Sequence, residues 1–170
     1  MAEMVLVVAD GEWPEAKLLE TLLEAAEFTI ALDGAADRFT SWDAVVGDMD
    51  SISNPQDFKG DYNPENTDLA KALMMYEVDA VVGISGGRLD HQLAAYAALF
   101  ETKSDAILYF DDWRACRVGE SGLEIELEKG TICSIMAFGH VAEITLSGVE
   151  FELDCEDIFT GTRGVGNTVT

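Results

Sequence analysis

The sequence predicts an α/β protein in which a doubly wound, mostly parallel α/β/α domain is followed by a small antiparallel β-sandwich domain. Over the first two thirds of the chain, short continuous apolar runs alternate with helical patterns, which is typical of a buried parallel sheet. Beyond that point the apolar segments are short, alternate with polar residues and are separated by glycines. The pattern changes near Asp111 and Asp112, so we expect domains at 1–111 and 112–170.

The elements of the first domain follow from the spacing of apolar residues. Five apolar runs predict parallel strands, each followed by a glycine, a serine or an aspartate: Met4–Ala9, Phe28–Leu32, Asp43–Val46, Asp79–Ile84 and Ala106–Phe110. Leucines and alanines that recur at helical spacing predict three helices: Leu18–Ala26, Thr67–Tyr76 and Leu89–Phe100. In the second domain, alternation predicts five short antiparallel strands: Arg114–Val118, Leu123–Leu127, Ile132–Ala137, Val141–Leu146 and Val149–Leu153.

The charge balance restricts the class of partner. The 170 residues include 33 Asp and Glu but only 10 Lys and Arg, which gives a formal net charge of −23. Such a chain repels phosphate backbones and anionic lipids, so we expect neither nucleic acid nor membrane as a partner. The three cysteines are far apart and form no Cys-x-x-Cys pair, and the apolar run at Met4–Ala9 is too short for a signal segment. We therefore expect a cytoplasmic protein.

The ends of the predicted strands carry the candidate functional residues. In open α/β sheets, ligands bind at the carboxyl ends of the strands, so polar residues there should converge around one crevice. These residues are Asp10, Asp33, Asp48, Asp50, Ser85–Arg88 and Asp90.

Asp48 and Asp50 lie one residue apart on a turn that follows a predicted strand. Hard oxygen ligands at this spacing suit Mg²⁺, which proteins hold through one or two carboxylates together with substrate phosphates. An aspartate-rich turn without a metal explains the same two residues, because aspartate favours turns. Asp68 lies in the first turn of a predicted helix. It is either a metal ligand or an acidic residue that the helix dipole favours at this end of a helix.

Gly86-Gly87-Arg88-Leu89-Asp90-His91 opens the next predicted helix. Two glycines let backbone amides approach an anion at a helix N-terminus, and Arg88 adds a planar donor for phosphate. His91 is explained equally well as a proton donor or acceptor and as a structural histidine. The chain has no GxxxxGK[ST], GxGxxG or GxSxG motif, which excludes P-loop kinases and disfavours dinucleotide oxidoreductases and acyl-enzyme chemistry. Carboxylates, a glycine-rich loop and one arginine therefore indicate a metal-bound polyphosphate substrate.

Several motifs, in order, resemble the thiamine pyrophosphokinase family. They are Ala31–Ala36 (ALDGAA), Gly47–Ile52 (GDMDSI), Asn66–Leu73 (NTDLAKAL), Gly86–His91 (GGRLDH), Gly148–Leu153 (GVEFEL) and Gly166–Thr168 (GNT). The resemblance spans about Ala31 to Thr168. It departs from the family pattern at Gly166, where the family usually has serine, at Phe151, where it has tryptophan or tyrosine, and at Asn66.

The resemblance implies transfer of pyrophosphate from MgATP to the hydroxyl of thiamine, with Mg²⁺ on Asp48, Asp50 and Asp68. It implies that these three aspartates and Asp90 are catalytic, either Asp68 or Asp90 accepting the hydroxyl proton. By the same resemblance, the nucleotide site comprises Asp33, Gly34, Ser85, Gly86, Gly87, Arg88 and His91, and the thiamine site comprises Phe151, Gly166, Asn167 and Thr168. It also implies a homodimer with shared active sites. Alternatives are a pyrophosphokinase acting on a hydroxymethylpterin and a non-catalytic sensor of thiamine diphosphate or nucleotide.

Overall fold

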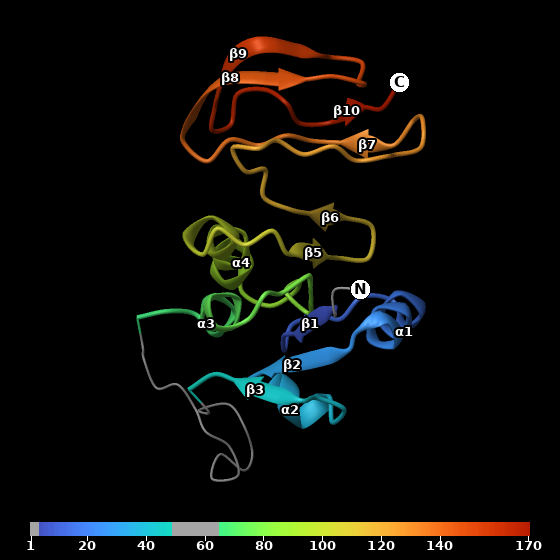
Figure 1. Cartoon of the computed structure of the whole chain (residues 1–170), viewed down its shortest axis with the longest axis vertical. Helices are drawn as coiled ribbons and strands as arrows, with labels where there is room; N and C mark the ends of the chain where they lie inside the picture. The colour runs from blue at the N-terminus through green and yellow to red at the C-terminus, as the bar shows by residue number, and fades with distance from the viewer. Residues whose placement is uncertain (1–3, 49–64) are drawn as a thin grey trace. The chain divides into compact units, whose positions relative to one another are not determined.

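The computed structural model describes residues 4–48 and 65–170 (Figure 1). By their internal contacts these residues form two compact units, Met1–Gly122 and Leu123–Thr170. The units divide after Gly122, whereas the change of sequence pattern lies near Asp111 and Asp112. The stretch between these points stays with the first unit because β6, at Arg114–Ala115, pairs with the sheet of that unit.

The first unit contains a six-stranded sheet with the strand order β3-β2-β1-β4-β5-β6. Its strands are β1 Val5–Val8, β2 Phe28–Leu32, β3 Ala44–Val46, β4 Ala80–Val82, β5 Ile107–Tyr109 and β6 Arg114–Ala115. The first five strands pair in parallel and β6 pairs antiparallel to β5. The predicted mostly parallel α/β fold is therefore confirmed. Because β2 and β3 lie on one side of β1 and β4 and β5 on the other, the direction of winding reverses between β1 and β4.

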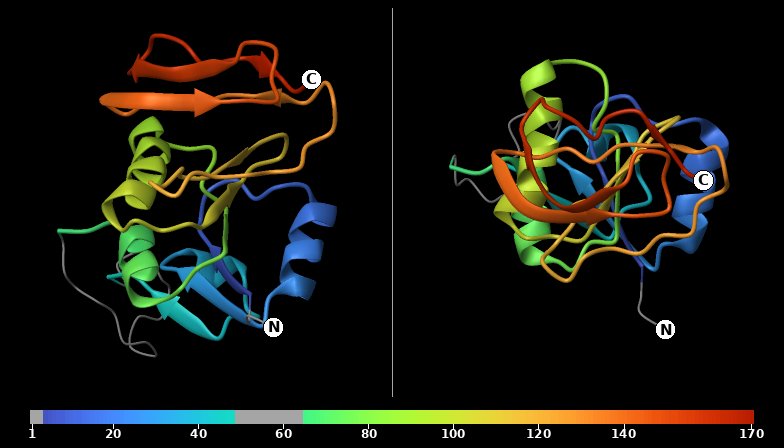
Figure 2. Two further views of the ribbon diagram at one scale, coloured as in Figure 1. Left: turned by 45° about the horizontal axis from the view of Figure 1, so that its top comes forward. Right: turned by 90° about the horizontal axis from the view of Figure 1, so that it is seen from above.

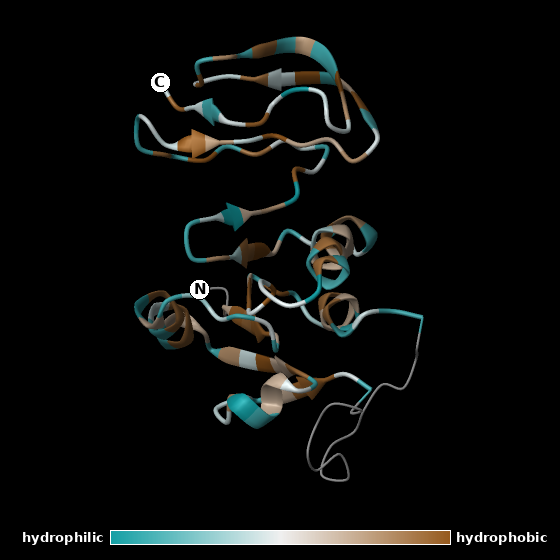
Figure 3. Cartoon of the chain, turned by 180° about the vertical axis from the view of Figure 1, so that it is seen from behind, coloured by the Kyte–Doolittle hydropathy of each residue, from teal (hydrophilic) through white to brown (hydrophobic). Residues whose placement is uncertain are grey.

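Helices cover both faces of this sheet. They are α1 Ala16–Ala25, α2 Ala35–Arg38, α3 Asp68–Met75 and α4 Leu89–Glu101. Alternate residues of a strand point to opposite faces, so Val7 packs in one core cluster with Leu73 of α3 and Leu99 of α4, while Leu6 and Val8 pack in the other with α1 and α2. Figure 2 shows α1 on the opposite side of the sheet from α3 and α4. The strands between these layers are among the brown, hydrophobic segments of Figure 3.

The second unit consists of two small antiparallel sheets. One pairs β7 Ile132–Cys133 with β10 Asn167–Thr168, and the other pairs β8 His140–Leu146 with β9 Leu153–Phe159. Ala137, Leu153 and Ile158 form its buried core. Antiparallel pairing is as expected, but the strand assignment is partly wrong: Leu123–Leu127 is no strand, and the predicted strand at Val149–Leu153 begins only at Leu153.

Within the described ranges, 4–48 and 65–170, none of the helices combines the length and the apolar composition that crossing a membrane requires.

Candidate functional site

Three aspartates meet at the carboxyl edge of the parallel sheet. Asp33 directly follows β2, Asp48 follows β3 after one glycine, and Asp68 is the first residue of α3. Each offers a carboxylate oxygen, and these oxygens all lie within 4.8 Å of one another. We call Asp33, Asp48 and Asp68 the carboxylate cluster. Of the residues expected to converge at the strand ends, Asp33 and Asp48 lie in this cluster, Asp10 and Asp90 do not, and Asp50 lies outside the described residues.

The local backbone holds Asp33 in the cluster. Its main-chain N–H donates to the carbonyl of Val46 at the end of β3, at 3.0 Å, and the residue is 7% exposed. Asp33 has a positive φ of 38°, a conformation that aspartate tolerates better than most residues. A Cβ atom on Gly47 would lie 2.8 Å from the Cβ of Asp33, so only glycine fits there. Strain and close packing at this position are typical of a functional site.

Asp68 is placed by a helix cap. Thr67 is the N-cap of α3, and its hydroxyl accepts a hydrogen bond from the N–H of Ala70 at 3.2 Å. The cap fixes the first turn and with it the carboxylate of Asp68, which the positive end of the helix dipole also favours.

Lys71 is a residue of the site that the sequence prediction missed. Its side chain is 4% exposed, although lysine is almost never fully buried unless it is paired. Its ammonium lies 3.0 Å from Oδ1 of Asp68, one helical turn away. Its position three residues after Asp68, within the apolar run Leu69–Leu73, was the available signal.

The carboxylate cluster suits Mg²⁺. Oxygens that share one Mg²⁺ lie about 3 to 4 Å apart, because each Mg–O bond measures about 2.1 Å. A spacing within 4.8 Å needs only a small side-chain rotation to reach that geometry. Together the three carboxylates and the ammonium of Lys71 have a formal charge of −2, which one divalent cation balances. Asp33 was predicted as part of the nucleotide site, whereas here it joins Asp48 and Asp68.

The turns after β1 and β4 are bonded to each other beside the point where the winding reverses. The N–H of Gly11 donates to the carbonyl of Gly83 at 2.7 Å, and the N–H of Glu12 donates to the carbonyl of Ser85 at 2.7 Å. The hydroxyl of Ser85 donates back to the carbonyl of Glu12 at 3.1 Å. A Cβ atom on Gly11 would lie 2.4 Å from the carbonyl oxygen of Gly83, so the turns approach as closely as glycine allows.

The glycine-rich loop continues from this pair of turns. Gly86 and Gly87 both have positive φ values, 72° and 62°, which require glycine and direct the chain into α4. Arg88 is the N-cap of α4, and its side chain is exposed. His91 is also exposed, and its main-chain N–H donates to Oδ1 of Asp90 at 3.0 Å.

Arg88 and Asp90 form a two-point ion pair. Nε of Arg88 donates to Oδ1 of Asp90 at 3.0 Å, and Nη2 donates to Oδ2. The hydrogen bond from Arg88 holds the pKa of Asp90 below its usual value, and Asp90 raises the pKa of Arg88. Asp90 is not part of the carboxylate cluster. Two N–H groups of Arg88 are occupied by Asp90, and the remaining three can contact an anion.

In the second unit, the predicted thiamine residues form a local network. The amide oxygen of Asn167 accepts from the N–H groups of Phe151 and Thr168, both at 3.0 Å, and its amide nitrogen donates to the carbonyl of Phe151 at 2.7 Å. Asn167 is 4% exposed, whereas the side chain of Phe151 is largely exposed. Gly166 adjoins this network, and its N–H donates to the hydroxyl of Ser134 at 3.0 Å. Asn167 thus holds the backbone of Phe151 and leaves the ring free.

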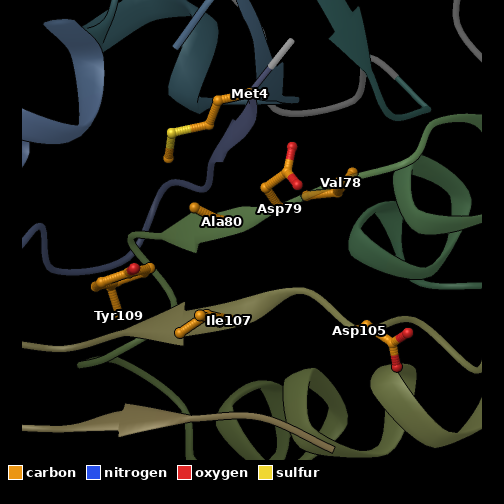
Figure 4. A pocket seen from close by; sticks show the side chains of 7 residues that line it. All are labelled: Met4, Val78, Asp79, Ala80, Asp105, Ile107 and Tyr109. Atoms are coloured by element: carbon orange, nitrogen blue, oxygen red, sulfur yellow. The ribbon is translucent and has the colours of Figure 1, made fainter. Parts of the chain in front are cut away.

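A pocket of about 410 Å³ lies elsewhere on the first unit (Figure 4). Asp79 and Asp105 come just before β4 and β5, at the amino edge of the sheet and not at the carboxyl edge. None of the predicted site residues lines it. The lining residues are Met4, Val78, Asp79, Ala80, Asp105, Ile107 and Tyr109.

Comparison with known proteins gives one family. The family profile "Thiamin pyrophosphokinase, catalytic domain" matches residues 19–110, more than half of the chain. This match includes the carboxylate cluster and the glycine-rich loop.

Solved structures show the same fold. The thiamine pyrophosphokinase of Bacillus subtilis has 21% sequence identity and a TM-score of 0.69, over 98% of this chain and 90% of that one. A thiamin pyrophosphokinase family protein of Enterococcus faecalis has 21% identity and a TM-score of 0.70 over the same shares. The thiamin pyrophosphokinase of Geobacillus thermodenitrificans has 16% identity and a TM-score of 0.61, over 98% and 88%. No curated protein sequence matches the chain.

Proposed function

Because the chain belongs to the thiamin pyrophosphokinase family, we propose that it transfers a pyrophosphate group from MgATP to the hydroxyl of thiamine, giving AMP and thiamine diphosphate. The observation that carries this proposal is the carboxylate cluster, whose three oxygens meet within 4.8 Å at the carboxyl edge of the sheet. Ligands of open α/β folds bind at this edge.

Asp33, Asp48 and Asp68 would hold the metal, together with Asp50 from outside the described residues. Bound Mg²⁺ supplies positive charge that offsets the negative charge of the triphosphate and polarises its phosphorus–oxygen bonds. Lys71 holds Asp68 through the 3.0 Å ion pair and reduces repulsion within the cluster. Asp33 is fixed by its backbone, so its carboxylate needs little reorganisation on binding.

The reaction needs an attacking oxygen, a leaving group and a proton acceptor. The thiamine hydroxyl oxygen bonds to the β-phosphorus of ATP, and the bond from that phosphorus to the bridging oxygen of AMP breaks. The hydroxyl proton passes to a carboxylate, for which Asp68 and Asp90 are the candidates. Arg88 lowers the pKa of Asp90, so Asp90 is ionised and ready to accept, although weakly basic. The three remaining N–H groups of Arg88 would bind phosphate oxygens.

We also propose that thiamine contacts the second unit. The exposed ring of Phe151, held by Asn167, offers a flat apolar face to a cationic heterocycle. As the family resemblance implies, the protein would act as a homodimer with shared sites. Mixing Phe151→Ala with Asp48→Asn protein tests this arrangement, because one intact site returns in a heterodimer only if the two residues act from different chains. Activity no higher than that of the separate variants would contradict shared sites.

The function itself is tested by incubating the protein with MgATP and either thiamine or a hydroxymethylpterin, and identifying the products by mass. We expect AMP and thiamine diphosphate, and no product from the pterin. Formation of ADP with a monophosphate ester, turnover of the pterin alone, or binding of nucleotide without any turnover would each contradict the proposal.

A further inference from the structure

Arg38 makes an unusual set of contacts at the carboxyl edge of the sheet. It is the last residue of α2, on the segment that begins with Asp33. Its Nη1 donates to the carbonyl of Asp10 at 2.7 Å, to Oδ1 of Asp10 at 3.0 Å and to the carbonyl of Gly11 at 3.0 Å. One guanidinium nitrogen thus binds three oxygens of the turn after β1.

The plane of the same guanidinium contacts an aromatic ring. Cζ of Arg38 lies 4.4 Å from the centroid of the Trp13 ring, a cation–π geometry. Trp13 is itself fixed, since its Nε1 donates to the carbonyl of Ala9 at 2.8 Å and its ring packs edge-to-face on Phe39. Arg38 is therefore held by both its edge and its face, which is more than a surface ion pair with Asp10 requires.

The turn that Arg38 holds supports the glycine-rich loop directly. Glu12 and Ser85 are joined by two hydrogen bonds: the N–H of Glu12 donates to the carbonyl of Ser85, and the hydroxyl of Ser85 donates to the carbonyl of Glu12. A Cβ atom on Gly86 would lie 2.5 Å from the side chain of Glu12, so the two residues are in close contact. A displacement of the turn would therefore move or release Ser85 and Gly86.

We propose that Arg38 is a positioning residue of the nucleotide site. It joins the segment that carries Asp33 to the turn after β1, and through that turn to the loop that begins at Ser85. The carboxylate cluster and the glycine-rich loop must bind the same triphosphate, so their relative placement sets how well it is bound. This inference rests on the proposed function, in which both elements contact MgATP.

The test compares Arg38→Gln with Arg117→Gln. Arg117 is a matched control because its guanidinium also binds two carbonyls and one carboxylate, those of Ser104, Lys103 and Asp105. These partners precede β5, at the amino edge of the sheet. Arg38→Lys is the conservative variant: its ammonium can donate to the same oxygens but has no planar face for Trp13.

Calorimetric titration with MgATP gives the first readout. We expect the Kd of Arg38→Gln to rise by about tenfold or more, since small misplacements of binding groups have effects of this order. Arg38→Lys should lie between the wild type and Arg38→Gln, and Arg117→Gln should bind as the wild type does. In steady-state kinetics the KM for ATP should rise while the KM for thiamine stays within about twofold.

Hydrogen exchange gives the second readout. The amides of Gly11 and Glu12 should exchange faster in Arg38→Gln, and not in Arg117→Gln, because their bonds to Gly83 and Ser85 loosen. If Arg38→Gln binds MgATP as tightly as Arg117→Gln, or if both KM values rise equally, Arg38 has only a structural role and the inference is wrong. Wild-type protein that binds MgATP but forms no thiamine diphosphate would contradict the proposed function instead, and the binding comparison would still decide the role of Arg38. Should Arg38→Gln not fold, Arg38→Lys is judged by the same criteria.

Discussion

The pentapeptide Asp-Ala-Val-Val-Gly occurs twice, at residues 43–47 and 79–83, and the two copies differ in what they contribute. Each forms a strand of the parallel sheet, β3 and β4. Each begins with an aspartate that accepts a main-chain N–H of the neighbouring strand at 2.8 Å, Asp43 from Thr29 and Asp79 from Val5. At the amino edge both copies therefore bind a main-chain N–H of the neighbouring strand, and Asp43 in addition accepts from the hydroxyl of Thr29 at 3.0 Å.

The copies diverge one residue after the glycine. Asp48 follows the first copy and enters the carboxylate cluster, whereas Ile84 follows the second and packs against the core. In these two copies the aspartate before the strand bonds to the sheet, and the aspartate after β3 lies in the carboxylate cluster. Residue type alone does not distinguish them; the direction of the strand does.

The largest expected difference between the copies is in catalysis. Asp48→Asn should reduce turnover on the order of 10³-fold, because it removes one of the charges that we propose hold the metal. Its melting temperature without Mg²⁺ should stay unchanged or rise, since one of three neighbouring carboxylates loses its charge. Asp79→Asn should retain wild-type turnover. Steady-state assays across a Mg²⁺ titration decide this, and normal turnover of Asp48→Asn would remove Asp48 from the metal site.

The two glycines should differ in what their replacement damages. A Cβ atom on Gly83 would lie 2.2 Å from the carbonyl oxygen of Ala9, and Gly83 has a positive φ of 76°. Gly83→Ala should therefore cost about 2 to 4 kcal/mol of unfolding free energy. Gly47→Ala meets the Cβ and main chain of Asp33, but Gly47 does not have a positive φ, so it should cost about 1 to 3 kcal/mol while impairing Mg²⁺-dependent turnover. Urea denaturation and activity assays compare them; equal stability losses with equal activity would contradict the distinction.

The aspartates of the amino edge should matter modestly and only for stability. Asp79→Ala leaves the exposed N–H of Val5 without its carboxylate, at a cost of about 1 kcal/mol. Asp43→Ala leaves the part-buried N–H and hydroxyl of Thr29 without theirs, at a cost of about 1 to 3 kcal/mol. Turnover per folded molecule should not change. Chemical denaturation gives the stability difference, and a loss of activity in the folded fraction would show that this edge serves the reaction as well.

The smallest expected effect is the dependence of the melting temperature on salt, which should be the same for variants in either copy. With a net charge of −23, the folded chain repels itself, and NaCl at about 1 M shortens the screening length to about 3 Å. The melting temperature should rise with NaCl in the wild type, Asp48→Asn and Asp79→Ala alike. A flat or falling trend would mean that the acidic residues are already well dispersed or paired.

The sequence predicted the first unit well because its apolar runs are continuous and its helices periodic. Phe28–Leu32 is a strand as predicted, and the other four runs contain β1, β3, β4 and β5. The second unit was predicted less well, since glycines and irregular backbone interrupt its alternation. Cys155 and Glu143 in its longest strands have positive φ, and β10 at Asn167–Thr168 lies in a segment with no apolar alternation.

For the site, the sequence indicated two of the three aspartates that meet at the strand ends, but not the partners of the site residues. Strand direction was enough to bring Asp33 and Asp48 to one edge. The burial of Lys71 against Asp68 depends on how α3 packs, which spacing does not reveal. Arg38 likewise gains its contacts from the turn after β1, distant in sequence from α2. The bond between Asn167 and Phe151 joins residues that the sequence treats as separate contacts.

The most direct test of the account is the melting temperature as a function of MgCl₂ at constant ionic strength, for the wild type, Asp48→Asn and Asp79→Ala. Constant ionic strength keeps screening the same at every Mg²⁺ concentration, so a rise in melting temperature then reports binding of Mg²⁺ to the folded state. The account predicts that millimolar Mg²⁺ raises the melting temperature of the wild type and leaves that of Asp48→Asn unchanged. The melting temperature of Asp79→Ala is lower without Mg²⁺ but should rise by as much as that of the wild type. An equal rise in Asp48→Asn, or loss of the response in Asp79→Ala, would contradict the assignment of the metal site to the carboxyl edge.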